Sequence, residues 1–413
     1  RCLAQKFHFY QKGREKMTIS ERVKNINPSQ TLAITAQALE MKREGKKVIS
    51  FAAGEPDFGT PENIREEAIS AIREGFSHYT ASSGIIELKE AVVEKLKKDN
   101  KVEYKTSEII VSTGAKQCLF NTILTICEPC DEVLLPTPCW VSYTEQIKFA
   151  GAVPVFIITH QEEDFKLSAA QVEEKITPLT KLIILNSPNN PTGAVYDLEE
   201  LKKIAQLLLK YNIYCICDEI YEKLIYDNAK HLSMASLSDE IKEKIITING
   251  VSKSYAMTGW RIGYAAGPEE IIKGMSKIQG HSTSNPNSIA QKASVEALSG
   301  KQDTIEEMRK AFDERRKYMV KRLNEIEGIS CLTPDGAFYA FPNVSKILER
   351  GIEYNGKKIS NSFDLSNFIL KEAEVALIPG SAFEAEGYLR LSYAASLEDI
   401  KEGLDRIEKI LRF

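Results

Sequence analysis

The stretch of sequence that decides the fold is Asn249-Gly250-Val251-Ser252-Lys253-Ser254-Tyr255-Ala256-Met257-Thr258-Gly259-Trp260-Arg261-Ile262-Gly263. It follows the apolar run 245–248, which predicts a buried strand, and it places Lys253 among small and apolar residues. Burial disfavours the charged form of an amine, so a lysine in such a pocket is available as a nucleophile toward carbonyl groups. A single lysine more often lies in a surface turn, so the interpretation depends on the whole stretch, including Arg261.

Length and composition indicate a folded protein with more than one structural unit. A chain of 413 residues exceeds one ordinary core and predicts two domains. The hydrophobic fraction of 43% is ordinary, and no run approaches the roughly 18 to 20 apolar residues of a membrane span. The net charge of −4, with acids and bases interspersed, gives no electrostatic footprint for nucleic acid or an anionic membrane. We therefore expect small molecules and a second copy of the chain as partners.

The eight cysteines are scattered, several of them in apolar runs, and a chain of this length needs no disulfides. This pattern favours a reducing, cytoplasmic location. Cys127 and Cys130 have C-x-x-C spacing, but the second cysteine pair or nearby histidines of a zinc site are missing, so we expect no metal. Residues 1–16 are basic and lack the apolar core of a secretory signal. We expect them to be a leader or a cloning remnant, and import of a truncated precursor into an organelle stays open.

Helical and strand patterns alternate along most of the chain. Strands are expected at 109–112, 132–136, 153–158, 181–186 and 213–217, and helices at 62–74, 84–98, 116–127, 140–149, 168–176 and 197–210. This alternation predicts an α/β fold with a mainly parallel sheet, helices on both faces, and ligand sites at the carboxyl ends of the strands. Residues 18–47 are expected to be helical as far as Gly45. A long helix over 304–327 is expected to lead to strands at 336–341 and 388–393, a helix at 363–373, and a last helix from 397.

Two charged residues stand where strands could present them to a ligand. Asp218 follows the apolar strand 213–217, and a carboxylate at the end of a strand can stabilise a positive charge on a bound ligand. Arg390 lies between two leucines on a strand, so its side chain points to the face opposite theirs. There it can bind a carboxylate through two hydrogen bonds. The alternative for Asp218 is an ordinary acidic residue where a strand meets a loop. The alternative for Arg390 is a solvated arginine on a strand.

Several turns are compatible with ligand binding but are weaker signals. The turn Thr113-Gly114-Ala115-Lys116 lies between a strand and a helix, where backbone N–H groups can contact an anion. Trp140 can stack on a flat ring or lie in the core. The segments 54–58 and 186–193 are rich in turn residues, and glycine lets the backbone approach a ligand closely.

Together, these motifs resemble those of class I pyridoxal-phosphate aminotransferases. The lysine stretch resembles the lysine signature of that family, and the other motifs follow in the family's order over roughly residues 18–413. The chain is most similar to the gamma subgroup of aspartate aminotransferases, which includes aspartate–prephenate aminotransferases. The resemblance implies a fold-type-I architecture and a homodimer with shared active sites. The large cofactor-binding domain would span 59–310, and a smaller α/β domain would combine 17–58 with 311–413.

The resemblance also implies a role for each candidate residue. Lys253 would bind pyridoxal 5'-phosphate as a Schiff base and move the substrate proton. The other cofactor contacts would come from Asp218, Tyr221, Asn190, Arg261, Trp140, Gly114, Ala115 and, in the neighbouring subunit, Tyr79. The substrate contacts would come from Arg390, Gly54, Trp140, Asn190, Lys116 and Thr31.

Two positions depart from the wider family. Gly250 stands where many relatives carry a serine that touches the phosphate, and 279–283 contains no arginine for a distal carboxylate. In the gamma subgroup, residues resembling Lys116 and Thr31 bind the distal carboxylate instead, so we expect a dicarboxylic substrate.

The expected function is transfer of the amino group of L-aspartate to 2-oxoglutarate by a ping-pong mechanism. The alternatives are glutamate/aspartate–prephenate, aromatic or alanine transamination, and a β-lyase on the same fold. An alternative from another functional class is a cofactor-binding regulator. It would need a fused DNA-binding module and a basic surface.

Overall fold

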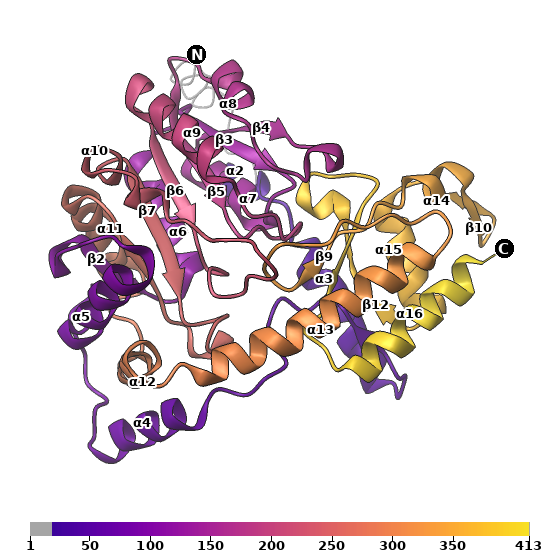
Figure 1. Ribbon diagram of the computed structural model, residues 1–413, viewed down its shortest axis with the longest axis horizontal. Coiled ribbons are helices and arrows are strands. Elements are labelled where there is room, and N and C mark those ends of the chain that lie inside the picture. The colour runs from indigo at the N-terminus through magenta and orange to yellow at the C-terminus, as the bar shows by residue number, and fades with distance from the viewer. Residues whose placement is uncertain (1–18, 413) are drawn as a thin grey trace, which may run out of the picture.

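The computed structural model describes residues 19–412, so the expected leader at 1–16 lies outside the described residues. Its main feature is a seven-stranded sheet in the order β2-β8-β7-β6-β5-β3-β4 (Figure 1). The strands are β2 Ile109–Ser112, β3 Glu132–Thr137, β4 Val153–Ile158, β5 Thr180–Asn186, β6 Tyr214–Asp218, β7 Ile245–Gly250 and β8 Gly263–Ala266. Only β8 runs antiparallel to its neighbours, so the prediction of a mainly parallel sheet is confirmed.

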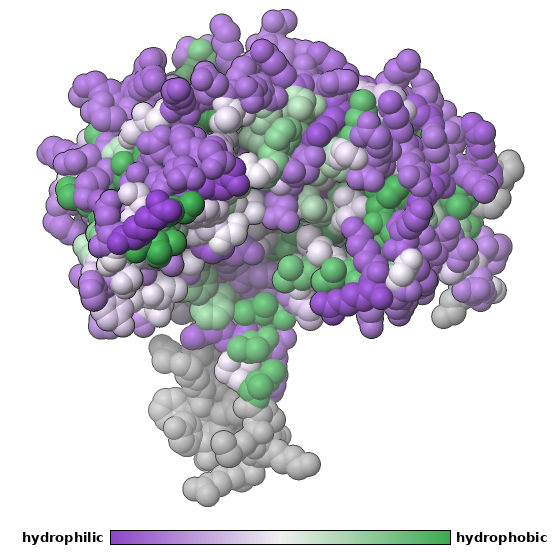
Figure 2. All heavy atoms as spheres, turned by 90° about the horizontal axis from the view of Figure 1, so that it is seen from below, coloured by the Kyte–Doolittle hydropathy of each residue, from purple (hydrophilic) through white to green (hydrophobic). Residues whose placement is uncertain are grey.

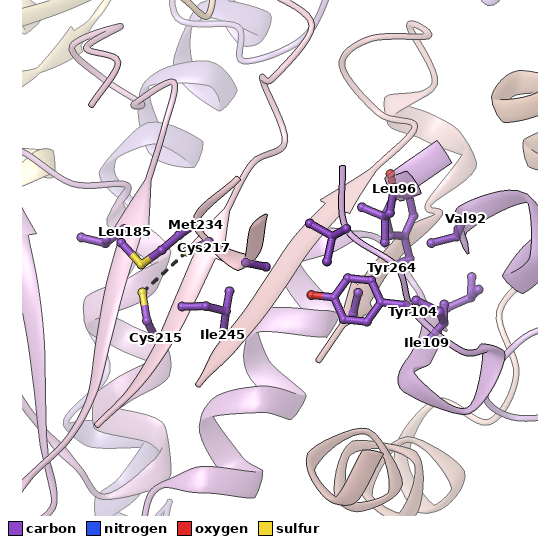
Figure 3. Close-up of a cluster of buried hydrophobic side chains, with 14 of the residues drawn as sticks. Val92, Leu96, Tyr104, Ile109, Leu185, Cys215, Cys217, Met234, Ile245 and Tyr264 are labelled. Carbon is purple, nitrogen blue, oxygen red and sulfur yellow. Dashed lines mark hydrogen bonds between the residues drawn. The ribbon is translucent and has the colours of Figure 1, made fainter. Parts of the chain in front are cut away.

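Helices cover both faces of this sheet. The helices of this part of the chain are α4 Glu62–Arg73, α5 Ile86–Lys95, α6 Ala115–Ile126, α7 Val141–Ala150, α8 Ala169–Lys175, α9 Leu198–Tyr211, α10 Asp239–Lys242, α11 Glu269–Ser282 and α12 Ser288–Ser299. Of these, α4 packs on α12 and lies apart from the sheet (Figure 1). Alternate strand residues enter two separate apolar clusters, because successive side chains of a strand point to opposite faces. Cys215 and Cys217 belong to one cluster and Ile216 to the other. Figure 3 shows the first cluster, in which Leu185 and Ile245 pack beside the two cysteines.

The C-terminal part of the chain forms a second body with its own apolar cluster. A three-stranded antiparallel sheet joins β13 Ile378–Pro379, β14 Leu389–Ser392 and β9 Tyr339–Ala340. Around it lie α14 Ser345–Arg350, α15 Ser362–Glu372, α16 Leu397–Leu411 and the hairpin of β10 Ile352–Tyr354 with β11 Lys357–Ile359. The long helix α13 Asp303–Glu325 leads into this body from α12 (Figure 1).

An N-terminal segment also belongs to the second body. Strand β1 Ile49–Ser50 pairs in parallel with β12 Val375–Ala376. Residues far apart in the sequence therefore meet, as the expected small domain requires. The domain bounds 17–58, 59–310 and 311–413 stay a prediction.

The mostly helical pattern expected over 18–47 is confirmed as two helices, α2 Glu21–Lys24 and α3 Gln30–Arg43. The segment between them contains Pro28, and a proline disfavours helix in the residue before it. Two expected elements were wrong in detail. The helix expected at 84–98 ends in a π-helical turn, η2 Leu96–Asn100. The strand expected over 336–341 is reduced to β9. The elements β8, α11 and α12 were not predicted.

The surface of the described chain carries some exposed apolar side chains near its start. The residues here that are at least half exposed are Ile19, Val23, Leu32 and Leu39. Figure 2 shows apolar side chains among hydrophilic ones on this face of the molecule. Within residues 19–412, no helix combines the length and the apolar character needed to cross a membrane.

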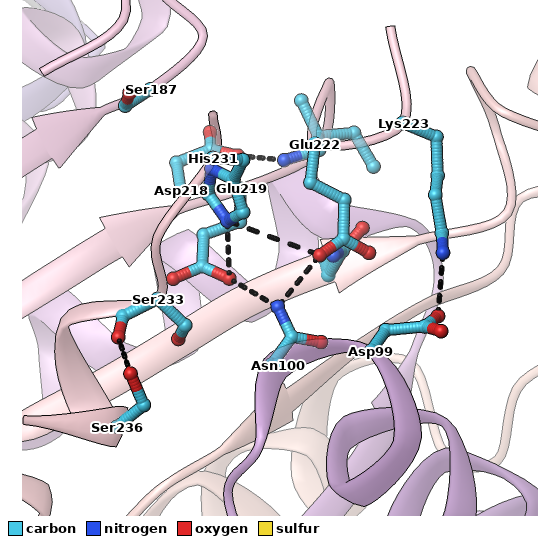
Figure 4. A network of polar contacts seen from close by, with 12 residues as sticks. Asp99, Asn100, Ser187, Asp218, Glu219, Glu222, Lys223, His231, Ser233 and Ser236 are labelled. Carbon is cyan, nitrogen blue, oxygen red and sulfur yellow. Dashed lines mark hydrogen bonds and ion pairs between the residues drawn. The ribbon is translucent and has the colours of Figure 1, made fainter. Parts of the chain in front are cut away.

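A buried polar network holds the segment after β6 against α5 and η2 (Figure 4). Lys95 forms an ion pair with Glu222, and Asn100 donates hydrogen bonds to Glu219 at 3.2 Å and to Glu222 at 2.7 Å. His231 Nε2 lies 3.1 Å from Glu219 Oε2. Burial by itself would raise the pKa of Glu222, but Lys95, His231 and Asn100 together lower it to about 2.

This network has the geometry of a possible cation site, because ligand atoms of Glu219, Glu222 and His231 lie within 4.8 Å of one another. The ammonium of Lys95 already pairs with Glu222, so we interpret the group as an ion-pair network. Its two glutamates flank Tyr221 on either side. The network therefore fixes the backbone that carries one of the candidate site residues.

We expect Lys95→Met to lower the free energy of unfolding at pH 7 by about 3–5 kcal/mol, because it leaves buried carboxylates without their ammonium partner. The stabilisation from Glu222 is complete above its unfolded pKa near 4.5 and is lost as the pH falls through 4.5 toward 2. The variant should lose much of this pH dependence. Urea unfolding at pH 7 and at pH 4 measures both effects.

Lys223→Met is the matched control, since Lys223 pairs with Asp99 at 2.7 Å in a more exposed part of the same network. A pair of this kind contributes about 0–1 kcal/mol. Equal losses in the two variants would contradict the assignment of a buried charge network.

Candidate active site

The candidate residues gather where neighbouring parallel strands end. Asp218 is the last residue of β6, and Asn190 follows the end of β5. Lys253 lies three residues beyond the end of β7. The carboxyl ends of parallel strands meet at one edge of the sheet, so these three side chains converge there.

Lys253 lies at the centre of this group. It is partly exposed, and its amine donates a hydrogen bond to the backbone carbonyl of Gly54. Its Nζ atom lies 5.8 Å from the ring centre of Tyr221. Burial of the amine, assisted by the charges of Arg390 and Arg261 and opposed by nearby carboxylates, lowers the pKa of Lys253 to about 8. About a tenth of such amines are neutral at pH 7.

Asp218 is buried and held by two hydrogen bonds. The hydroxyl of Tyr143 donates to it at 2.6 Å, and the backbone N–H of Ile220 donates at 3.2 Å. Burial raises the pKa of Asp218 to about 6, although the Tyr143 hydrogen bond acts in the opposite direction. At pH 7 the carboxyl group is therefore mostly ionised and can stabilise a protonated nitrogen.

The start of α6 forms an anion-binding corner with Arg261. Gly114 caps the helix with a φ of 81°, and a Cβ atom there would lie 2.4 Å from the guanidinium of Arg261. A Cβ atom on Gly263 would lie 2.1 Å from the backbone nitrogen of Ala115. The two glycines thus let Arg261 and β8 lie directly against the helix N-terminus. Backbone N–H groups and an exposed guanidinium together favour a phosphate or carboxylate.

Arg390 brings a buried positive charge into the same region. It is 2% exposed, donates to Asn190 Oδ1 at 3.0 Å and donates to the carbonyl of Ala52 at 2.9 Å. Its Nε atom is buried without a hydrogen-bond partner, and within residues 19–412 its guanidinium donates to neutral oxygens and not to a carboxylate. Burial lowers its pKa. A buried guanidinium without an acidic partner fits a ligand carboxylate.

A second cation lies near the tryptophan. The Nζ atom of Lys116 is 4.8 Å from the ring centre of Trp140, and burial together with the charge of Arg261 lowers the pKa of Lys116. Lys116 lines a cavity of about 300 Å³ with Ser29 and other residues. Thr31 is on α3, and its hydroxyl is buried without a hydrogen-bond partner in the described chain.

Tyr79 differs from the other candidates in its exposure. Tyr79 is 91% exposed in the loop between α4 and α5, and within the described part of the chain it forms no hydrogen bond or ring contact with another candidate. Its expected contact with a neighbouring subunit stays a prediction.

Two site residues were missed from the sequence. Tyr143 holds Asp218, and its only sequence signal is a position three residues after Trp140, on the same helix face. Tyr339 lies 2.9 Å from Tyr221, hydroxyl to hydroxyl. It lies within the expected strand 336–341, and its ring and that of Phe338, with centres 4.7 Å apart, both pack against Tyr221.

Comparison with known proteins gives consistent matches. A family model described as "Aminotransferase class I and II" matches residues 46–407. The chain is 48% identical to the aspartate aminotransferase of Bacillus sp. (strain YM-2), over 96% of this chain and 100% of the relative. It is 50% identical to the probable aspartate/prephenate aminotransferase of Aquifex aeolicus (strain VF5), over 95% and 98% of the two chains. The solved structure of Thermus thermophilus aspartate aminotransferase with maleate is similar at a TM-score of 0.89, with 40% identity over 95% and 100% of the chains.

We expect the amine of Lys253 to react at a lower pH than an ordinary lysine. In protein free of small-molecule ligands, labelling of Lys253 by an amine-selective reagent should be half-maximal near pH 8. Ordinary lysines titrate near pH 10.4. Peptide mass mapping across a pH series measures the midpoint at this site, and Lys253→Arg identifies the labelled peptide. A midpoint near pH 10.4 would show that the amine is not desolvated.

Proposed function

The chain belongs to the aminotransferase class I and II family, and on this basis we propose that it is a pyridoxal 5'-phosphate-dependent aspartate aminotransferase. It would transfer the amino group of L-aspartate to 2-oxoglutarate in a ping-pong cycle. The observation that supports this most directly is an accessible lysine amine of lowered pKa beside the ionised Asp218 and the unpaired Arg390.

The residues present fit pyridoxal 5'-phosphate. Lys253 would hold it covalently, Asp218 would pair with the ring nitrogen, and Trp140 would cover a ring face. Arg261 and the N-terminus of α6 at Gly114 and Ala115 would bind the phosphate, where the missing Cβ of Gly114 leaves room. Tyr221 and Asn190 would donate to the phenolic oxygen. When bound, the cofactor withdraws electrons from the substrate's α-carbon, which makes its proton removable.

Asn190 has a second task that follows from its hydrogen bond. Its Oδ1 atom accepts from Arg390, so the Nδ2 donor of the same amide points away from that arginine. One amide can thus orient the substrate-binding guanidinium and donate to a second ligand atom.

The chain's own groups account for proton movement and substrate orientation. With a pKa near 8, the Lys253 amine can accept a proton from the α-carbon and return it to another atom at neutral pH. Arg390 would bind the substrate α-carboxylate through two hydrogen bonds, which fixes the α-carbon relative to Lys253. Asp218 stays ionised above about pH 6 and stabilises positive charge on the ring.

Two cationic groups in one site favour a dicarboxylic substrate. Arg390 would take the α-carboxylate, and Lys116, with Thr31, would take the distal one. The name of the Bacillus relative includes aspartate, and the Thermus structure is titled with maleate, a dicarboxylate. The alternative, a glutamate/aspartate–prephenate aminotransferase, is supported by the name of the Aquifex relative. An aromatic aminotransferase remains a further alternative on the same fold.

We also propose a homodimer with shared active sites. Tyr79 is highly exposed and could reach the cofactor phosphate of a second copy. Ile72 and Ile86, at 59% and 52% exposure, lie on either side of Tyr79 in sequence and offer apolar surface for that copy. A cytoplasmic location stays a prediction from the cysteine content.

We expect Lys253→Ala to abolish the visible absorbance of covalently bound cofactor and to reduce aspartate turnover by more than about 100-fold, since the base is lost. Lys244→Ala, which removes a lysine bonded to Asn212 on the surface, is the control and should keep both properties. Absorbance spectra and single-turnover rates with aspartate, glutamate and prephenate give the measurement and identify the preferred donor or acceptor. Retention of both properties in Lys253→Ala would refute the proposed chemistry.

We expect Lys116→Ala to raise the KM for aspartate by about 10- to 100-fold, as for loss of a charged hydrogen bond. The KM for an apolar amino acid should change far less, because that substrate lacks the distal carboxylate. Lys148→Ala provides the control, since Lys148 pairs with Glu145 on α7. Equal effects of Lys116→Ala on both substrates would reject its role in specificity.

A further inference from the structure

Tyr339 lies between two groups that the proposed function assigns to different ligands. It is 0% exposed and is on β9, which pairs with β14 so that Tyr339 lies opposite Ser392. Arg390 is two residues before Ser392 and therefore shares its face of the strand. The guanidinium carbon of Arg390 is 4.4 Å from the ring centre of Tyr339.

The hydroxyl end of Tyr339 reaches the other group. Its oxygen is 2.9 Å from the hydroxyl of Tyr221, and the two rings meet nearly at right angles, with centres 5.8 Å apart. A Cβ atom on Gly54 would lie 3.1 Å from this hydroxyl, and the carbonyl of Gly54 accepts the hydrogen bond of Lys253. Tyr339 thus contacts both Tyr221 and the loop of Gly54, whose carbonyl accepts from Lys253.

We propose that Tyr339 is a positioning residue that couples the cofactor side of the site to the substrate side. This inference rests on the proposed function, in which Tyr221 contacts the phenolic oxygen and Arg390 contacts the substrate carboxylate. The hydroxyl of Tyr339 would donate to the oxygen of Tyr221, which leaves the single O–H of Tyr221 for the phenolic oxygen, and hydrogen bonds in a chain strengthen one another. The ring face of Tyr339 supports the guanidinium of Arg390 by a cation–π contact.

The two functions of Tyr339 belong to different atoms, so they can be separated by substitution. Tyr339→Phe removes the hydroxyl and keeps the aromatic face. Tyr339→Leu removes both. Tyr393→Phe is the matched control, because Tyr393 is also fully buried in the second body and its hydroxyl donates to the carbonyl of Ala337 at 3.2 Å.

The first measurement is the pH midpoint of the visible absorbance of the bound cofactor. Tyr339→Phe should shift this midpoint by about half to one pH unit, in the same direction as Tyr221→Phe. The double variant should shift no further than Tyr221→Phe alone, since Tyr339 acts through Tyr221. The control Tyr393→Phe should leave the midpoint unchanged.

The second measurement is the dissociation constant of maleate, used as an unreactive dicarboxylate probe. Tyr339→Phe should leave it within about twofold, whereas Tyr339→Leu should raise it by about 3- to 10-fold, because only the second variant removes the face under Arg390.

Each outcome decides between the alternatives. An unchanged midpoint in Tyr339→Phe, or additive shifts in the double variant, would overturn the coupling through Tyr221. Equal maleate affinity in Tyr339→Phe and a folded Tyr339→Leu would overturn the support of Arg390, and a Tyr339→Leu chain that does not fold leaves the midpoint shift as the deciding test. Failure of the unaltered protein to bind the cofactor at all would instead refute the proposed function.

Discussion

The positive charge of Arg390 is buried without an acidic partner in the described chain, and the organisation of the site depends on this. Removing a guanidinium from water is costly unless an anion replaces the water, so the folded protein favours a carboxylate at this point. Within residues 19–412, the hydrogen-bond acceptors of Arg390 are neutral oxygens, from Asn190 and Ala52. These hold the guanidinium in place without neutralising its charge, which fits the proposed substrate carboxylate.

The same constraint explains why the site lies between the two bodies of the fold. Arg390 is on β14 in the C-terminal body, whereas its partner Asn190 follows β5 of the large sheet. The carbonyls of Ala52 and Gly54 come from the segment after β1. Three parts of the chain that are far apart in sequence therefore together fix the positions of Arg390 and Lys253. A ligand bound to both Arg390 and Lys253 would bridge the C-terminal body and the large sheet, which links ligand binding to how the bodies are held together.

Much of this arrangement could be predicted from the sequence, because it depends on local periodicity. Apolar runs such as 245–248 predicted the strands, and residues that follow their carboxyl ends, such as Asp218, predicted the site edge. The resemblance to a known family supplied candidates at the other turns. Tyr143 and Tyr339 could not be predicted, since their roles depend on contacts across 75 and 118 residues. The break before α3 and the antiparallel strand β8 were also missed, because short segments carry too little periodic signal.

The pairing of Gly250 with Gly263 has a consequence for the loop between them. A Cβ atom on Gly250 would lie 2.9 Å from the Cα atom of Gly263, so the two strands close the base of the loop tightly. Lys253 and Arg261 both lie within this closed loop. The number of residues between Lys253 and Arg261 therefore limits the distance between the Lys253 amine and the corner formed by Arg261 and the start of α6. An insertion or deletion in the loop would change that distance.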